Sequence, residues 1–144
     1  MDHIHDYANR IGMAMWKTHR RMSAEMAEYK EHGLTGPQFF MLNMISFEGP
    51  TKVARLAERM EVKPSATTVM LDRLEQSGFI VREMDKNDRR AVIVSLTPKG
   101  KDVLKQVKKE SNEILSRFLS VLSDDELETF THLYEKLIPE EAKE

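Results

Sequence analysis

A change in the spacing of apolar residues after Gly78 limits the possible folds of this sequence more than any other feature. Before this glycine, apolar residues recur every three or four positions, as they do on one face of an α-helix. After it, the segments 79–84 and 91–96 are short, apolar and rich in β-branched residues, which is typical of strands. The polar cluster 85–90 between them predicts a turn. The sequence therefore predicts a β-hairpin with a charged tip directly after a helix.

Two short helices are predicted immediately before this hairpin. The first spans residues 52–60. The second begins at Pro64, a residue favoured at the first helical position, and ends before Gly78. Only residues 61–63 join them, so the pair matches a helix-turn-helix. A helix-turn-helix that is followed at once by a hairpin is a winged helix.

Longer amphipathic helices are predicted on both sides of this module. The first covers residues 2–30, and Thr35 caps a second helix that ends at Gly49-Pro50. Thr97-Pro98 begins another helix, which continues to about residue 122, and Ser123 starts the last one with a capping-box sequence. The apolar stripes of the terminal helices are longer than one winged-helix core can cover. We therefore expect a second copy of the chain to cover them.

These elements predict a mainly α (α+β) fold, a winged helix-turn-helix with long N- and C-terminal dimerisation helices. A length of 144 residues fits one domain. Within that domain we assign residues 1–34 and 101–144 to dimerisation helices and residues 35–100 to the winged helix-turn-helix DNA-binding region.

The composition excludes several classes of protein and site. The chain has no cysteine, so disulfides and thiolate zinc sites are excluded. A membrane-spanning helix needs about 20 mostly apolar residues in a row, and the chain has no such stretch. Its polar, acidic N-terminus is unlike a signal peptide. We therefore expect a cytoplasmic protein with no membrane partner.

Basic residues concentrate in the middle of the chain. The formal net charge is −2, but residues 52–101 contain 11 Lys and Arg against 7 Asp and Glu. A DNA-facing module on an acidic scaffold has this distribution, and so does a chance fluctuation of surface charge. Charge alone favours neither interpretation.

The helix from Pro64 to Gly78 has two faces at 100° per residue. The face expected in the core carries Thr67, Met70, Leu71 and Leu74. The opposite face carries Ser65, Thr68, Val69, Asp72 and Gln76, with Arg73 at its margin. Short side chains on the first turns suit a helix that enters a major groove about 12 Å wide, where hydroxyls can bond to bases or phosphates and Val69 can meet a thymine methyl. An ordinary packed surface helix is the alternative interpretation.

The predicted hairpin tip carries Arg89 and Arg90. A narrow minor groove has a negative potential that attracts arginine, so these side chains are candidates for that groove. We expect Asp88 to hold the turn or an arginine through charge-assisted hydrogen bonds rather than to contact DNA. A plain solvated hairpin is the alternative if the tip is considered alone.

Together these features resemble the MarR family of bacterial winged helix-turn-helix regulators. The residues that carry the resemblance are Pro64-Ser65, Asp72-Arg73-Leu74-Glu75, Gly78, Arg82, Asp85, Asp88-Arg89-Arg90 and Leu96-Thr97-Pro98-Lys99-Gly100. The flanking helices occur in the family's order, so the resemblance covers essentially the whole chain and is most specific between Asp72 and Gly100. It implies a six-helix α+β protomer and a homodimer in which the first and the last two helices of both subunits interlock.

The resemblance also implies roles for individual residues. The leading turns of the second helix would meet the major groove with the DNA-binding residues Pro64, Ser65, Ala66, Thr68 and Val69. Arg89 or Arg90 would enter the minor groove, and Arg73 would bond to phosphate or brace the wing. Family members often carry arginine where this chain has Val69, which implies a different operator preference. A two-fold dimer places its recognition helices about 34 Å apart or at a multiple of that distance, which predicts a roughly palindromic operator.

Relatives in this family often bind small aromatic or lipophilic effectors beside the winged helix. Candidate lining residues for such an effector pocket are Trp16, His19, Phe39, Phe40 and Phe47. The alternative is that the aromatic residues and the ten methionines pack the core and the dimer.

No catalytic residue, metal site or cofactor is predicted. The chain has no GxSxG sequence, no phosphate-binding glycine loop and no HExxH motif, so we do not expect an enzyme. His3 and His5 lie at a polar terminus without an evident third ligand.

The leading hypothesis is a sequence-specific double-stranded DNA-binding regulator, a repressor that responds to a small-molecule effector. The alternative is a winged-helix module for protein–protein interaction. That alternative predicts no salt-dependent affinity for DNA, because no counterions would be released on binding.

Overall fold

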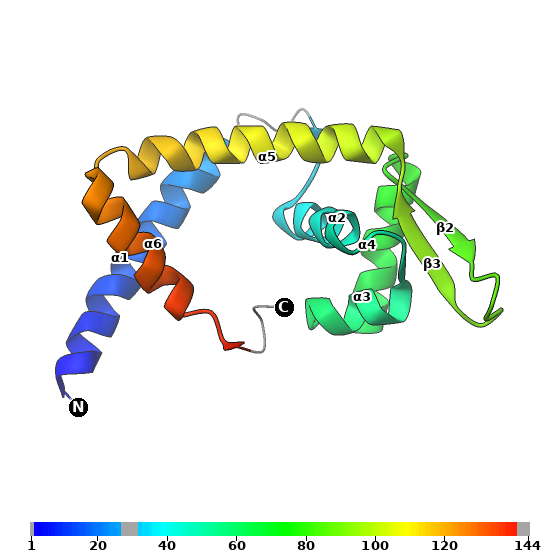
Figure 1. The fold of residues 1–144 in the computed structure, drawn as a ribbon, viewed down its shortest axis with the longest axis horizontal. Coiled ribbons are helices and arrows are strands. Elements are labelled where there is room, and N and C mark those ends of the chain that lie inside the picture. The colour runs from blue at the N-terminus through cyan, green and yellow to red at the C-terminus, as the bar shows by residue number, and fades with distance from the viewer. Residues whose placement is uncertain (1, 27–31, 141–144) are drawn as a thin grey trace. The chain divides into compact units, whose positions relative to one another are not determined.

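The computed structural model describes residues 2–26 and 32–140, so residues 27–30 of the predicted first helix lie outside the described residues. Figure 1 shows the elements in chain order, which are α1 (Asp2–Met26), α2 (Gly36–Glu48), β1 (Thr51–Lys52), α3 (Val53–Met60), α4 (Pro64–Gln76), β2 (Ile80–Met84), β3 (Val92–Leu96), α5 (Pro98–Leu119) and α6 (Asp124–Lys136). The mainly α winged-helix fold expected from the sequence is confirmed.

The chain divides into two compact units. The helical unit comprises α1, α5 from Ser111 onward and α6, and the winged-helix unit comprises α2 to β3 and α5 up to Glu110. This division differs from the boundary that the sequence suggests at residue 100. The beginning of α5 carries Val103, Leu104 and Val107, and these side chains are part of the winged-helix core.

Reciprocal capping explains where α2 and α6 begin. Gln38 N donates to Thr35 Oγ1 at 3.3 Å, and Thr35 N donates to Gln38 Oε1 at 3.0 Å. Ser123 and Glu126 form the same pair at the start of α6. Each pair satisfies N–H groups that have no partner inside the helix. The two predicted helix starts are therefore confirmed.

The winged-helix core is built from one face of each of its helices and from the sheet. Its most deeply buried side chains are Met41, Leu42, Ile45, Leu56, Leu71, Leu74, Ile80 and Val94. On α4, Thr67 and Leu71 are 0% exposed, as the helical periodicity predicts, whereas Met70 is half-buried at the edge of this face. The helix therefore presents its opposite face to solvent.

A short strand that the sequence does not indicate completes the sheet. Thr51 and Lys52 form β1 and pair antiparallel with Val94 and Ile93 of β3, which gives the strand order β1-β3-β2. The sequence places Lys52 at the start of a helix, but α3 begins one residue later at Val53. A strand of this length has no periodicity of its own and depends on its partner.

The predicted hairpin is confirmed, and it extends from the rest of the winged-helix unit (Figure 1). Its register runs from Ile80 opposite Leu96 to Met84 opposite Val92. Beyond the paired strands, Asp85 N donates to Ala91 O at 3.0 Å and closes the tip.

In the helical unit, α5 ends at Leu119 rather than near residue 122. Leu122 N donates to Leu119 O at 3.1 Å, a bond across three residues that tightens the chain into a turn before Ser123 caps α6. The turn after Leu119 therefore leads the chain into the extended capping residue Ser123.

Apolar side chains remain exposed on α1 and α6. No residue of α6 is buried. The exposed apolar residues of the two helices include Ile4, Tyr7, Ile11, Met15, Phe130, Leu133 and Tyr134, and Leu137 directly after α6 is exposed as well. Among the described residues, none of the helices combines the length and the hydropathy needed to cross a membrane.

Candidate nucleic-acid interface

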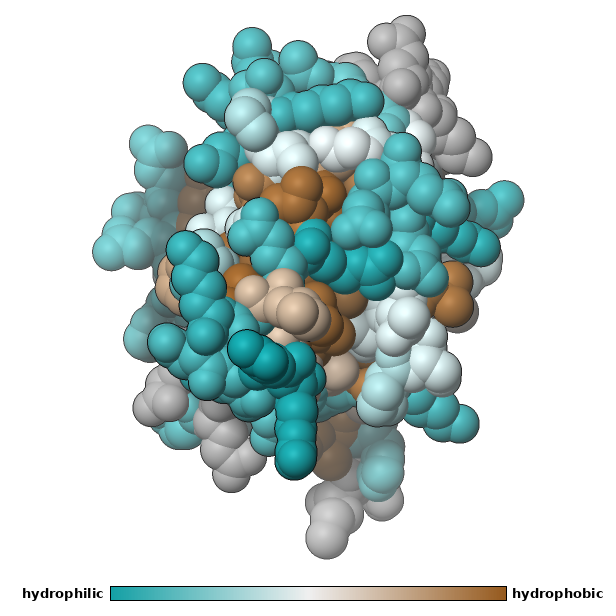
Figure 2. Space-filling model, turned by 90° about the vertical axis from the view of Figure 1, so that its right-hand side faces the viewer, coloured by the Kyte–Doolittle hydropathy of each residue, from teal (hydrophilic) through white to brown (hydrophobic). Residues whose placement is uncertain are grey.

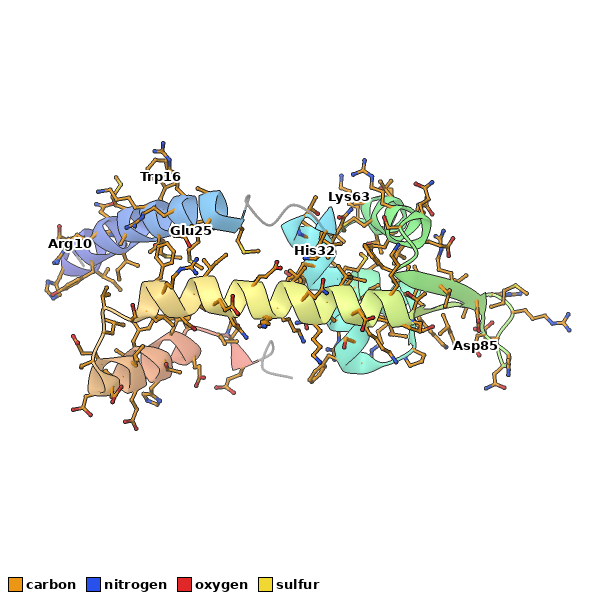
Figure 3. All side chains as sticks on the ribbon, turned by 90° about the horizontal axis from the view of Figure 1, so that it is seen from above. Arg10, Trp16, Glu25, His32, Lys63 and Asp85 are labelled. Carbon is orange, nitrogen blue, oxygen red and sulfur yellow. The ribbon has the colours of Figure 1, made fainter. Side chains whose placement is uncertain are left out.

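The leading turns of α4 present only short side chains to solvent. The helix starts at Pro64 after Lys63, whose backbone is extended (Figure 3). Its predicted DNA-facing residues are all exposed, namely Pro64, Ser65, Ala66, Thr68 and Val69. Val69 is 50% exposed although its side chain is apolar. The structure therefore brings these residues together on one accessible surface of the helix.

The hydroxyl of Thr68 is already bonded to its own helix. Thr68 Oγ1 donates to Pro64 O at 3.0 Å. A threonine hydroxyl has one hydrogen to donate and two lone pairs that accept. With the hydrogen directed at Pro64, the side chain offers a ligand its lone pairs and a methyl group.

Arg82 connects the hairpin to the solvent-exposed side of α4. Its Nη2 lies 2.7 Å from Asp72 Oδ1 and 3.0 Å from Glu75 Oε1, and its Nε donates to Glu75 Oε2 at 3.1 Å. The hydrogen bonds from Arg82 lower the pKa of the Glu75 carboxyl, and the bonds to Glu75 and then Asp72 raise the pKa of the Arg82 guanidinium. Arg82 and Glu75 therefore stay charged near neutral pH. Their pairing fixes β2 against the helix.

This role of Arg82 does not follow from the sequence, where the residue is recognised only as part of a family motif. The family resemblance gives Arg73 two possible roles, bracing the wing or binding phosphate. Arg73 is exposed and has no ion-pair partner within residues 2–26 and 32–140. The one sequence signal for the ion pairs of Arg82 is the spacing of Asp72 and Glu75, because acidic residues three positions apart lie on one side of a helix. Phosphate binding stays the prediction for Arg73.

Hydrogen bonds within the turn hold the wing tip. Asp88 Oδ1 accepts from Arg90 N at 3.0 Å, and Asp85 Oδ1 accepts from Asn87 N at 3.0 Å. Asp85 lies where β2 runs into the tip (Figure 3). Asp88 thus bonds to the backbone of the turn, and the side chains of Arg89 and Arg90 stay exposed.

Thr97 and Gly100 fix the start of α5 against the end of α4. Thr97 Oγ1 donates to Gly78 O and accepts from Gly100 N at 3.0 Å. A Cβ atom on Gly100 would lie 2.0 Å from Phe79 O, so the approach of these two backbones requires glycine. Lys99 Nζ lies 5.4 Å from the centre of the Phe79 ring. These motif residues therefore hold the start of α5 against the segment that joins α4 to the hairpin.

The hairpin end of the winged-helix unit is mostly hydrophilic, with hydrophobic side chains exposed between the polar ones (Figure 2). The large apolar residues exposed on α4 and the hairpin are Val69, Val81, Met84 and Val92. A DNA-binding surface needs both kinds of group, because charged groups contact phosphates and apolar groups contact base edges.

The candidate effector residues fall in both units. Trp16 and His19 are on α1 in the helical unit, and Trp16 projects from the helix with 58% of its surface exposed (Figure 3). On α2, Phe39 packs against the winged-helix core, while Phe40 and Phe47 are exposed. Their grouping into one pocket stays a prediction. The described residues contain no cluster of three or more histidines and carboxylates that could hold a metal ion.

The MarR family model matches residues 34–92, from just before α2 to the first residue of β3. The chain is 38% identical over 128 residues to the HTH-type transcriptional repressor MdtR of Bacillus subtilis (strain 168). This alignment covers 88% of this chain and 83% of that protein. It is 26% identical over 140 residues to the HTH-type transcriptional regulator MgrA of Staphylococcus aureus, covering 96% and 94%. The second alignment therefore includes the flanking helices.

Solved structures agree with these sequence relatives. The crystal structure of the YusO protein from Bacillus subtilis superposes with a TM-score of 0.75 at 36% identity and covers 92% of this chain and 94% of that one. A mutant of MarR from E. coli, crystallised in complex with operator DNA, gives a TM-score of 0.73 at 27% identity, with 89% and 93% coverage. The similarity extends over nearly all of each chain.

Proposed function

This chain belongs to the MarR family, and from that premise we propose that it is a homodimeric transcriptional repressor that binds operator DNA sequence-specifically. The observation that carries the proposal is the surface of the winged-helix unit, where the short-chained face of α4 and the arginines of the wing belong to one compact body. MdtR and MgrA are transcriptional regulators, and the expectation that the chain is not an enzyme is confirmed by this kinship.

In this proposal the exposed face of α4 enters the major groove. Ser65, Ala66, Thr68 and Val69 contact bases or phosphates there, and Pro64 fixes the direction in which the helix begins. Arg73, further along the same helix, binds phosphate. A helix with short leading side chains can approach the base edges closely, because nothing long separates its backbone from them.

The wing contacts the neighbouring minor groove in the same proposal. Arg89 or Arg90 enters the groove, and Asp88 keeps the turn in the required conformation through its bond to Arg90 N at 3.0 Å. Because Arg82 fixes β2 to α4, the hairpin and the helix approach DNA as one rigid element.

The exposed apolar side chains on α1, on α6 and directly after α6 support the proposed homodimer. Phe130 is 46%, Leu133 53% and Leu137 77% exposed, and no residue of α6 is buried within its own chain. A second copy can cover these side chains with its own, as the symmetry of homodimers requires. Sedimentation equilibrium tests this. A protein that stays monomeric at micromolar concentration contradicts the proposed dimer.

Selection of bound fragments from random double-stranded DNA by the full-length protein tests the proposed function. We expect a roughly palindromic consensus with half-sites about one DNA turn apart, and an affinity that falls as salt rises. No enrichment, together with DNA affinity that does not respond to salt, would favour the protein-interaction module instead. The Arg89→Ala, Arg90→Ala double variant is the matched control. Unchanged operator affinity in this variant contradicts the role of the wing.

A small apolar effector is the second part of the proposal. An effector that binds better to the DNA-free arrangement shifts the population away from the operator. Trp16 is the only tryptophan, so its fluorescence reports on one candidate residue without labelling. A compound that changes this emission and also lowers operator affinity supports the response. A compound that changes neither does not act as the effector.

A further inference from the structure

We propose that the recognition helix reads A·T base pairs, with Val69 and Ala66 contacting thymine methyl groups and the Thr68 hydroxyl accepting a hydrogen bond from adenine. The proposal rests on the proposed DNA-binding function and adds the class of base pair that this surface recognises. It follows from what α4 exposes and from where the hydrogen of the Thr68 hydroxyl is directed.

The leading turns of α4 lack the side chains that read guanine. The commonest specific contact in the major groove is arginine or lysine donating two hydrogen bonds to guanine O6 and N7, and asparagine or glutamine reads adenine in a similar way. None of these four residue types occurs from Pro64 to Leu71. Base contacts by this part of the helix must therefore come from hydroxyls and apolar groups.

The Thr68 hydroxyl can act toward DNA only as a hydrogen-bond acceptor. Thr68 Oγ1 lies 3.0 Å from Pro64 O and donates its hydrogen to that oxygen, so only its lone pairs remain for a base. In the major groove the hydrogen-bond donors are the amino groups of adenine and cytosine, whereas guanine and thymine present acceptors. Thr68 therefore fits adenine or cytosine and does not fit guanine.

Val69 distinguishes between these two bases. Its side chain is apolar and 50% exposed, and Ala66 lies three residues before it on the same exposed side. The C5-methyl group of thymine is the apolar group that base edges present in the major groove. An A·T pair offers this methyl together with the amino group of adenine, whereas a G·C pair offers an amino group without a methyl. The combined surface therefore matches A·T pairs.

Replacing thymine by uracil tests the proposal, because it removes the methyl group and leaves the hydrogen-bonding groups unchanged. The DNA is the site selected by the full-length protein, with each thymine of one half-site replaced singly by deoxyuridine. We expect the wild-type protein to lose affinity about fourfold at one or two positions, the factor that corresponds to burying one CH₂ group at about 0.8 kcal/mol. Substitution in both half-sites should square this factor.

Variants assign the effect to side chains. Val69→Ala should lose most of the preference for thymine over uracil at the position that Val69 contacts, because its two γ-methyl groups are gone, and should keep any preference at a position that Ala66 contacts. Thr68→Val keeps the shape of the side chain and removes its lone pairs, so it should lose discrimination for adenine at the neighbouring pair. Both residues are exposed, so neither change should lower the melting temperature measurably.

The outcomes separate this proposal from the proposed function. Salt-dependent binding to a selected operator that is unaffected by uracil at every thymine overturns the reading of methyl groups and leaves the regulator function intact. The same holds if Val69→Ala retains the full preference for thymine over uracil at every position. A protein that selects no DNA at all contradicts the proposed function itself.

Discussion

Arg82 Nη2 on β2 lies 2.7 Å from Asp72 Oδ1 on α4. The same guanidinium holds Glu75 one helical turn further along, so one residue of the hairpin offsets part of the negative charge of two carboxylates on the recognition helix. Unneutralised, these carboxylates would repel DNA phosphates. The wing and the helix are therefore linked mechanically and electrostatically.

Arg82→Met should lower operator affinity by about threefold to tenfold at low salt, because Asp72 and Glu75 lose their counter-charge and the hairpin loses its bond to α4. Titrations with labelled operator measure the change. Adding Asp72→Asn and Glu75→Gln to the variant should restore part of the affinity, since it removes the repulsion. Wild-type affinity in Arg82→Met would show that the ion pairs do not matter for DNA binding.

Asp88 affects DNA affinity in two opposite ways, because its negative charge repels DNA and its hydrogen bond holds the turn that presents the arginines. Removing an acidic residue near DNA should strengthen binding on electrostatic grounds. Asp88→Asn removes the charge and keeps an oxygen that can accept from Arg90 N, so we expect equal or tighter binding. Asp88→Ala removes the acceptor as well, and we expect weaker binding because the turn loosens. If both variants bind more tightly, Asp88 does not act by holding the turn.

Arg73→Ala should weaken binding by a similar factor on operator and on unrelated DNA. A phosphate contact carries no sequence information, and its loss should reduce the slope of log affinity against log salt by about one. The measurement is a set of titrations at several salt concentrations on both DNAs. A loss confined to the operator would instead assign Arg73 to a base.

Gly100→Ala should reduce the free energy of unfolding by about 2–3 kcal/mol, because the new Cβ would lie 2.0 Å from Phe79 O and the backbones must move apart. Gly36→Ala is the matched control, since a Cβ there meets nothing within 4 Å. Its effect should stay within about 1 kcal/mol. Urea unfolding at equal protein concentration compares the two. Equal effects would show that Gly100 is not sterically required.

The capping box of α6 predicts a pH effect that one substitution can isolate. Hydrogen bonds from Ser123 lower the pKa of Glu126 below its ordinary value of 4.5. A carboxyl with a lowered pKa in the folded state stabilises the fold above about pH 4.5, and this contribution disappears as pH falls through the folded-state pKa. The variant Glu126→Gln should keep the capping geometry without titrating, because a glutamine, Gln38, fills the same position in the capping box of α2.

The test compares melting temperatures of wild type and Glu126→Gln at pH 7 and pH 3. The advantage of the wild type should be larger at pH 7 than at pH 3. A difference that does not change with pH would mean that the lowered pKa of Glu126 contributes nothing to stability.

Several features of the fold depend only on neighbouring residues and can be predicted from the chain alone. The starts of α2 and α6 follow from capping pairs three residues apart, and the two faces of α4 follow from helical periodicity. The hairpin follows from two apolar segments around a polar turn. These signals act over a few residues, so they are visible in the chain before it folds. The family motifs added expected roles for individual residues, such as phosphate binding or wing bracing by Arg73.

Contacts between distant residues depend instead on how the core packs. The pairing of Thr51 and Lys52 with β3 spans about half of the winged-helix unit, and a strand of two residues has no local signal. The bonds of Arg82 to α4 and the approach of Gly100 to Phe79 likewise join separate elements. The bond from Thr68 Oγ1 to Pro64 O joins neighbours within one helix, but the residue type alone does not predict it, because a threonine in a helix divides between two side-chain rotamers.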